Sequence, residues 1–301
     1  MFYEFQVKHN ATKANKNLNK ALEKDFFLNP LLFNIGDGKL RNIRNFNADY
    51  RVAPNNKLIY CMNTKSMCTV MEELMCLLYD PIEYLKKNIS ITDRMYSSMT
   101  CRNPPAVLNN RNKLRHFINY PNDKSYNYHI IVRDPIDRFL SGFVDKCIRE
   151  RIKDNNKMKN CFGCGYDIEC FINEIYRRAK IFHDTGELHP YTMEDFHFMP
   201  QSWKCYLNEE KEKYKIFYYT NKTKLYSDLD DYYKNVGVPS YLREKIQRDL
   251  RSNFTEHKTF DSPIRTLFED FLRYDKELTK KLVNLYYTDY VMFNFTIPKL
   301  D

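Results

Sequence analysis

Two short, continuous apolar runs, each followed by a turn and a helical pattern, constrain the fold of this chain more than any other feature. The first run is 58–62, and after a polar turn the apolar residues over 70–78 recur at helical spacing. The second run is 128–132, which Arg133 closes. Runs without polar alternation are typical of strands that are buried on both faces. The pattern therefore predicts repeated strand–turn–helix units.

The rest of the chain extends this pattern. After the second run, Asp134 is a good N-cap and Pro135 suits the first helical position, and an apolar stripe continues to residue 148. A third strand is predicted at 215–219, and helices are predicted at 222–236, 240–251 and about 263–290. The predicted fold class is α/β, in three layers, with a mainly parallel sheet flanked by helices.

The first part of the chain differs in composition from the rest. Residues 1–50 are rich in Asn and Lys, and we expect them to form a loosely packed lead-in. Residues 51–301 show no internal repeat or flexible linker, and 43% of the chain is hydrophobic. We therefore expect one domain over 51–301.

Glycine is scarce, with 7 residues in 301. No three of them are spaced as G-x-G-x-x-G, and none precedes a Lys-Ser/Thr pair as in a Walker A loop. The sequence thus lacks the usual glycine-rich phosphate loops, which argues against a P-loop NTPase or kinase. A nucleotide site in this chain has to be built from other groups.

Lys and Arg exceed Asp and Glu by 48 − 39 = 9. Such an excess fits an ordinary solvated surface, and it also fits a polyanionic partner such as an anionic glycan. No zinc-finger spacing, RGG tract or long Lys/Arg block is present, so we expect no nucleic-acid partner.

The nine cysteines fall into two groups. Three lie among apolar residues and are interpreted as small core residues: Cys61, Cys68 and Cys76. The others crowd the centre of the chain, with one upstream: Cys101, Cys147, Cys161, Cys164, Cys170 and Cys205. The crowding indicates either disulfides in an oxidising lumen or a zinc site built on C-x-x-C.

The turn after the 58–62 strand offers an anion site. Ligands of open parallel sheets bind beyond the carboxyl ends of the strands, and the N-terminus of a helix favours negative charge. Lys65 adds a full positive charge, while Ser66 and Thr69 add hydroxyl groups. The alternative is an ordinary turn with an exposed lysine.

A second site follows the 128–132 strand and reads Arg133-Asp134-Pro135-x-x-Arg138-x-x-Ser141. The Arg133 guanidinium stands where it can bind a phosphate through two parallel hydrogen bonds, and Ser141 lies one to two turns into the helix. The alternative is a capped helix start with surface arginines.

Together these segments resemble the membrane-associated carbohydrate sulfotransferases of the chondroitin type, most closely their nematode group. The 5′-phosphosulfate loop of that family reads close to P-K-x-x-C-T/S, and residues 64–69 read T-K-S-M-C-T, with Thr64 in place of the proline. The family's 3′-phosphate motif, R-D-P-x-x-R-x-x-S, is matched in full by residues 133–141. The segment 197–201 with Cys205, and the segment 287–293, are similar to two further family patterns.

The resemblance implies a P-loop-like sulfotransferase fold. It also implies transfer of a sulfonyl group from 3′-phosphoadenosine 5′-phosphosulfate (PAPS) to a hydroxyl of a glycan partner, such as chondroitin at a 4-O position or a related chain, with no metal. The residues that it assigns to donor binding are Lys65, Ser66, Cys68, Thr69, Arg133 and Ser141. Lys65 would also neutralise charge on the leaving oxygen, as positioning and charge stabilisation dominate such transfers.

The acceptor hydroxyl needs a general base, and a histidine suits this role. His197 is the first candidate because of its motif, with His116 and His189 behind it. An alternative reading is an inactive relative that binds anionic glycan or nucleotide, which Thr64 and Met67 in the donor loop motivate.

The resemblance also implies the Golgi lumen and favours disulfides over zinc, with the pairing left open. Five Asn-x-Ser/Thr sequons, at 10, 88, 221, 253 and 294, agree with a glycoprotein of the secretory pathway. No apolar signal segment or membrane-spanning run is visible, so membrane association would need a segment that is not present in this chain.

Overall fold

The computed structural model describes residues 46, 48–93, 101, 106–153, 160–252 and 262–298, which form two compact units. The sheet unit consists of the described residues within Phe46–Arg133 and Trp203–Lys258. The helical unit consists of those within Asp134–Ser202 and Thr259–Asp301. Apart from residues 46 and 48–50, the expected lead-in over 1–50 lies outside the described residues. The single domain over 51–301 stays a prediction.

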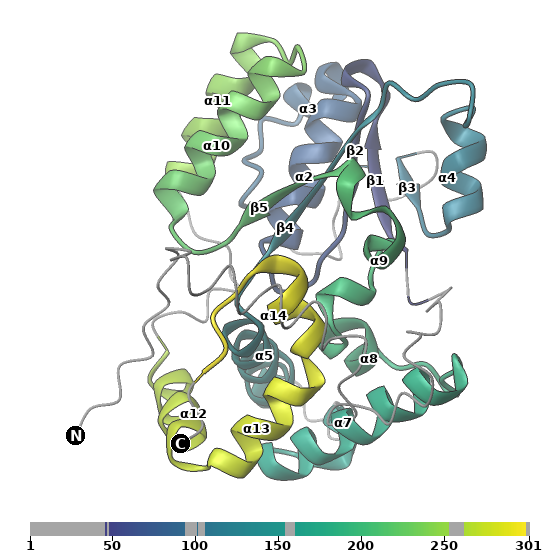
Figure 1. The fold of residues 1–301 in the computed structure, drawn as a ribbon. Helices are drawn as coiled ribbons and strands as arrows, with labels where there is room; N and C mark the ends of the chain where they lie inside the picture. Colours follow the sequence, from purple (N-terminus) through teal and green to yellow (C-terminus); the bar gives the residue numbers. More distant parts are fainter. Residues whose placement is uncertain are drawn as a thin grey trace, which may run out of the picture. The chain divides into compact units, whose positions relative to one another are not determined.

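The sheet unit is built on a five-stranded mixed sheet in the order β3-β1-β2-β4-β5 (Figure 1). Its strands are β1 (Tyr50–Ala53), β2 (Leu58–Cys61), β3 (Val107–Leu108), β4 (Asn127–Val132) and β5 (Tyr214–Tyr218). The three predicted strands are confirmed as β2, β4 and β5, and they run parallel to one another. Strands β1 and β3 are additional to the predicted ones; β1 pairs antiparallel with both β2 and β3, so half of the sheet's pairings are antiparallel.

The helices of the sheet unit are α2 (Cys68–Tyr79), α3 (Pro81–Lys86), α4 (Arg111–Phe117), α9 (Leu207–Glu210), α10 (Lys222–Asn235) and α11 (Ser240–Ser252). The predictions for 70–78, 222–236 and 240–251 are thus confirmed as α2, α10 and α11. Short 3-10 turns span Pro54–Asn56 and Lys211–Lys213.

Both faces of the sheet are covered within this unit. Since successive strand residues point to opposite faces, Arg51, Tyr60 and His129, which are paired in register, share one face. On that face Arg51 forms an ion pair with Glu72 of α2, and His129 contacts Tyr233 of α10. Residues of the opposite face, such as Val52 and Ile59, are also buried, and at the end of β2 this face carries Cys61, which is bonded to Cys205.

The helical unit contains α5 (Pro135–Phe143), α6 (Glu150–Lys153), α7 (Ile168–Thr185), α8 (Met193–Phe198), α12 (Pro263–Tyr274), α13 (Lys276–Leu285) and α14 (Tyr287–Phe293). Asp134 is the N-cap of α5, as predicted, and its side chain accepts from the N–H of Asp137 at 3.0 Å. A π-helical stretch, η3 (Val144–Arg149), continues α5. The stretch predicted as one helix over 263–290 is instead three helices, and Asp275 caps the second of them.

The segment that follows α8 is held in place by its backbone carbonyls. Arg138 is almost fully buried and donates to the carbonyl oxygens of His197 at 2.8 Å, Phe198 at 3.3 Å and Met199 at 2.7 Å. The hydroxyl of Tyr286 donates to the same Phe198 carbonyl at 2.8 Å. The arginine of the R-D-P-x-x-R motif therefore organises the backbone around His197.

Asp289, from the 287–293 motif, fixes the next residues of that segment. Its carboxylate accepts from the backbone N–H groups of Gln201 at 2.9 Å and Ser202 at 2.7 Å, and from the Gln201 side chain at 3.3 Å. Asp289 is 0% exposed, so these three donors satisfy a charge that is removed from water. Two motifs that lie far apart in the sequence thus meet inside the helical unit.

The cysteines form four disulfides and leave one free thiol, Cys68. The pairs are Cys61–Cys205, Cys76–Cys101, Cys147–Cys161 and Cys164–Cys170. Cys61 and Cys76 are buried in the core, as predicted, whereas Cys68 is partly exposed. The prediction did not include the disulfides of Cys61 and Cys76, because their partners lie elsewhere in the chain. The C-x-x-C pair that a zinc site would use is divided between two disulfides.

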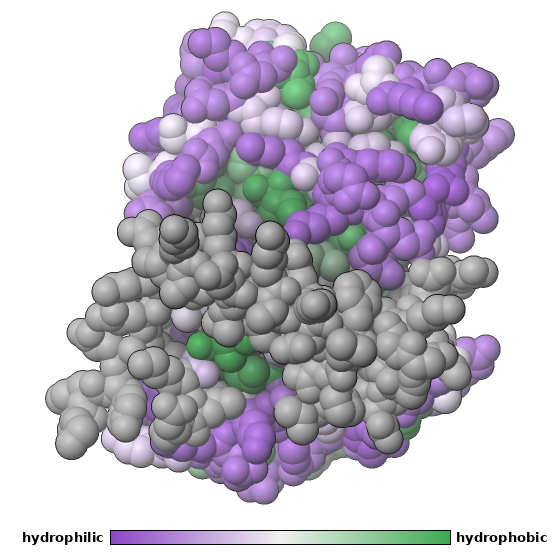
Figure 2. Space-filling view, viewed as in Figure 1, coloured by the Kyte–Doolittle hydropathy of each residue, from purple (hydrophilic) through white to green (hydrophobic). Residues whose placement is uncertain are grey.

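The described surface seen in Figure 2 is largely hydrophilic, with a few apolar patches. This agrees with a chain in which 29% of the residues are charged. None of the helices within the described ranges is both long and apolar enough to cross a membrane.

His129 generates a prediction about acid stability. The side chain is 0% exposed and is packed against aromatic rings. Burial lowers its pKa from 6.5 to about 3. Below pH 6.5 the unfolded chain binds a proton that the folded chain does not, so stability falls as the pH falls. Between pH 7 and pH 5 this loss is about 2 kcal/mol. We expect His129→Phe to remove that loss.

Urea unfolding at pH 7 and pH 5, with the disulfides kept oxidised, measures the effect. The variant His116→Phe, at an exposed position, is the control and should keep the wild-type pH dependence. An unchanged pH dependence in His129→Phe would show that burial of this imidazole does not set the acid sensitivity.

Asp289 generates a second prediction. In Asp289→Asn the amide presents a donor where the carboxylate accepts three N–H groups, so we expect the unfolding free energy to fall by about 2–3 kcal/mol. Denaturant titration measures the fall. Asp228→Asn, which removes an exposed ion pair with Lys224, should change stability by less than about 0.5 kcal/mol. Equal effects of the two changes would contradict the role given to Asp289.

Candidate active site

The β2–α2 loop, residues 62–67, lies in the sheet unit at the carboxyl end of a parallel strand. Asn63, Thr64 and Ser66 are buried, while Lys65 and Met67 are partly exposed. The Asn63 amide donates to the Ser66 hydroxyl at 3.1 Å and to the carbonyl of Ile131 at 2.9 Å. The loop is therefore bonded both within itself and to the neighbouring strand β4.

The backbone of this loop takes up conformations that are typical of glycine, although it contains no glycine. Lys65 and Met67 both have a φ of 64°, in the left-handed region that favours glycine. Met67 is the N-cap of α2 and offers no side-chain hydrogen bond to the first turn. The N–H groups at the start of this 12-residue helix, together with its dipole, favour a bound anion.

Arg133 joins the same site from the end of β4. Its guanidinium donates to the carbonyl of Lys65 at 3.1 Å and lies over the ring of Tyr219, 5.0 Å from the centroid. It is 6% exposed, so its charge is largely removed from water. The structure thus brings together Lys65 and Arg133, which the sequence placed in two separate motifs.

Cys68 and Thr69 are the first two residues of α2, and both are partly exposed. Burial raises the pKa of the Cys68 thiol, and the nearby Glu72 carboxylate raises it further. The positive charges of Lys65 and Lys204 oppose this rise. Cys68 is therefore a neutral group at the helix N-terminus, close to two ammonium groups.

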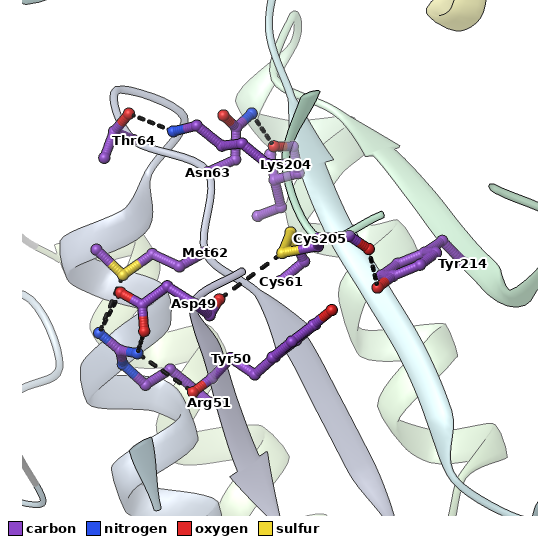
Figure 3. The surroundings of a disulfide bond; sticks show 11 residues. Asp49, Tyr50, Arg51, Cys61, Met62, Asn63, Thr64, Lys204, Cys205 and Tyr214 are labelled. Atoms are coloured by element: carbon purple, nitrogen blue, oxygen red, sulfur yellow. Dashed lines mark hydrogen bonds and ion pairs between the residues drawn. A yellow bond between two sulfur atoms is a disulfide. The ribbon is translucent and has the colours of Figure 1, made fainter. Parts of the chain in front are cut away.

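Sequence reasoning missed Lys204. Its ammonium group donates to the Thr64 hydroxyl at 2.8 Å, and the side chain is 1% exposed (Figure 3). The one available signal was its position next to Cys205, and nothing in the local sequence connects that cysteine to β2.

Two predicted site residues, Ser141 and His197, lie in the helical unit. Ser141 is buried on α5, two turns after Asp134. His197 is on α8, and its Nδ1 lies 2.6 Å from the carbonyl oxygen of Met193. Because a carbonyl only accepts, Nδ1 carries the proton and Nε2 of the neutral ring keeps its lone pair. The other candidates, His116 and His189, are exposed.

The chemistry available to these groups follows from their charges. A helix N-terminus, a partly exposed lysine and two buried cations in one unit suit a ligand with several negative charges, such as a phosphosulfate. In the other unit, His197 presents the tautomer that can accept a proton.

Comparison with known proteins agrees with this chemistry. A family model described as sulfotransferase family matches residues 48–296. The uncharacterized Caenorhabditis elegans protein C18B2.2 is 32% identical over 87% of this chain and 73% of its own length. The C. elegans carbohydrate sulfotransferase chst-1 is 28% identical over 83% of this chain and 76% of its own length.

A third C. elegans relative, vep-2, is named as a candidate sulfotransferase and is 37% identical over 53% of this chain and 49% of its own length. No solved structure matches the chain significantly. With the family model covering most of the sequence, the chain belongs to the sulfotransferase family.

Proposed function

We propose that this chain transfers the sulfonyl group of PAPS to a hydroxyl of a glycan, with chondroitin at a 4-O position or a related chain as the acceptor. The observation that carries the proposal is the convergence of Lys65, Arg133 and the N-terminus of α2 on one loop. The glycan acceptor rests on the similarity to a carbohydrate sulfotransferase and on the net charge of +9.

In the proposed reaction the acceptor oxygen attacks sulfur and forms a new S–O bond. The bond between sulfur and the bridging phosphate oxygen breaks, and 3′,5′-ADP leaves with the bonding electron pair. Lys65, with Ser66, Cys68, Thr69 and the N–H groups of α2, would bind the 5′-phosphosulfate and stabilise the charge on the leaving oxygen. No metal has a role in this scheme.

The 3′-phosphate would be bound by Arg133 and Ser141. A guanidinium that is already buried and fixed against Lys65 and Tyr219 loses little conformational freedom when it binds a phosphate. His197 would take the proton of the acceptor hydroxyl at Nε2, as the hydrogen bond of Nδ1 to Met193 allows.

Four disulfides support a place in the oxidising secretory pathway, since such bonds are rare in reducing compartments. We propose the Golgi lumen as the compartment. Of the sequons in the described residues, Asn88, Asn221 and Asn294 are all exposed, as glycosylation of the folded surface requires.

The donor site makes a prediction about Arg133. We expect Arg133→Ala to weaken binding of 3′,5′-ADP by about 10- to 100-fold, through loss of a charged hydrogen-bond donor. Adenosine 5′-phosphosulfate, which has no 3′-phosphate, should lose much less affinity. Calorimetric titration of both ligands measures the difference. Lys57→Ala, at an exposed lysine of the same unit, is the control.

Lys65→Ala should abolish transfer of labelled sulfate from PAPS to a desulfated chondroitin.

In Arg133→Ala, an equal loss of affinity for 3′,5′-ADP and for adenosine 5′-phosphosulfate would mean that Arg133 only shapes the loop. A wild type that binds 3′,5′-ADP but labels no acceptor in a broad glycan panel would contradict the catalytic function and favour an inactive binding relative.

The base makes a separate prediction. We expect His197→Gln to lower kcat by about 10²- to 10⁴-fold while 3′,5′-ADP binding stays unchanged. The decline of the rate towards acid pH, where a histidine base is protonated, should disappear from the residual activity. His116→Gln and His189→Gln are matched controls, and a comparable loss in either one would move the role of base to that residue.

A further inference from the structure

Lys204 is a buried cation in direct contact with the β2–α2 loop. Its ammonium group donates to Thr64 Oγ1 at 2.8 Å, and Thr64 is the residue that immediately precedes Lys65 (Figure 3). Lys204 and Thr64 are each 1% exposed. A long, flexible side chain is thus held beside the loop, where its charge is removed from water.

The backbone of Lys204 is anchored on both sides of the contact. The next residue, Cys205, is bonded to Cys61 at the end of β2, with a Cα–Cα distance of 6.1 Å. The Tyr214 hydroxyl, at the start of β5, donates to the Cys205 carbonyl at 2.9 Å. Figure 3 shows these groups together around the disulfide. Two strands of the sheet therefore determine where the ammonium group lies.

The charge of Lys204 acts on the same helix N-terminus as that of Lys65. Both ammonium groups oppose the rise in the pKa of the Cys68 thiol, and Cys68 is the first residue of α2. Between charges that are shielded from solvent, Coulomb interactions are several-fold stronger than in water. An anion bound at the loop would therefore interact with a buried cation as well as with the partly exposed Lys65.

Thr64 stands where the family pattern has proline. A proline ring restrains its own backbone dihedral φ. In this chain a side-chain hydrogen bond to a fixed ammonium group restrains position 64 instead. The following residue, Lys65, has a left-handed backbone, which a non-glycine residue adopts only when its surroundings impose it.

We propose that Lys204 is a positioning residue for the sulfonyl donor: it fixes the β2–α2 loop through Thr64 and adds a second positive charge beside it. This proposal rests on the proposed function, since it assumes that the loop binds the donor. Lys204 would act by holding the loop and through its own positive charge. Replacing it should therefore weaken binding of the donor and leave binding of the glycan acceptor unchanged.

The test compares Lys204→Met, Thr64→Val and the double variant in binding of 3′,5′-ADP and in steady-state kinetics. Lys204→Met keeps the length of the side chain and removes its charge, and we expect affinity for 3′,5′-ADP to fall at least about tenfold. Thr64→Val should lower the affinity for 3′,5′-ADP about threefold. The double variant should bind 3′,5′-ADP no more weakly than Lys204→Met does. The KM for PAPS should rise while the KM for the glycan stays constant.

The matched control is Lys57→Met, which removes an exposed lysine that also donates to a hydroxyl, that of Ser125 at 2.6 Å. It should leave all of these constants unchanged. If Lys204→Met does not fold, Thr64→Val still removes the hydrogen bond between Lys204 and Thr64, and a rise in its KM for PAPS tests the proposal.

Binding of 3′,5′-ADP by the wild type and the variants separates an error in the role of Lys204 from an error in the proposed function. If wild type binds 3′,5′-ADP, Lys65→Ala does not, and Lys204→Met binds as wild type does, the proposed function stands and the role of Lys204 is wrong. Additive losses in the double variant would exclude the route through Thr64. If wild type itself does not bind 3′,5′-ADP, the proposed function is wrong and this proposal is wrong with it.

Discussion

The disulfide between Cys61 and Cys205 is the constraint on which the candidate site of the sheet unit depends. It joins the end of β2 to a residue 144 positions later in the chain. Closing so long a loop by a covalent bond removes many conformations from the unfolded chain. In the folded chain it fixes the backbone beside Lys204, and so brings a buried ammonium group to the loop that carries Lys65.

The β2–α2 loop adopts backbone conformations that favour glycine, although it contains none. Two non-glycine residues in left-handed conformations cost about 1–3 kcal/mol each. Hydrogen bonds from Asn63, Arg133 and Lys204 to the loop or its neighbouring strand offset this cost. The glycine shortage is therefore compatible with the proposed anion site, in which the positive charges beside the loop would also attract the ligand.

The helical unit shows that a matched motif does not identify which residues touch a ligand. Arg138 and Asp289 belong to patterns that resemble functional motifs, yet both are buried and bind backbone groups of the 197–202 segment. The terminal nitrogens of Arg138 donate to carbonyl groups, and the Asp289 carboxylate accepts from N–H groups, within the unit. The residues of these motifs that are proposed to contact ligands are others: Arg133, Ser141 and His197, whose Nδ1 donates to the carbonyl of Met193.

The sequence by itself determined the local structure: three parallel strands, the turn before α2, the Asp134 cap and the positions of most later helices. These features depend on residues close together in the chain, whose spacing and capping chemistry can be read directly. Only the tertiary structure decided the antiparallel strands β1 and β3, the disulfide pairing, the contact of Arg133 with Lys65 and the burial of Lys204. Apart from the pairing of β1 with β2, which are neighbours in the chain, each of these joins residues far apart in the sequence, and the folded packing and the disulfides bring them together.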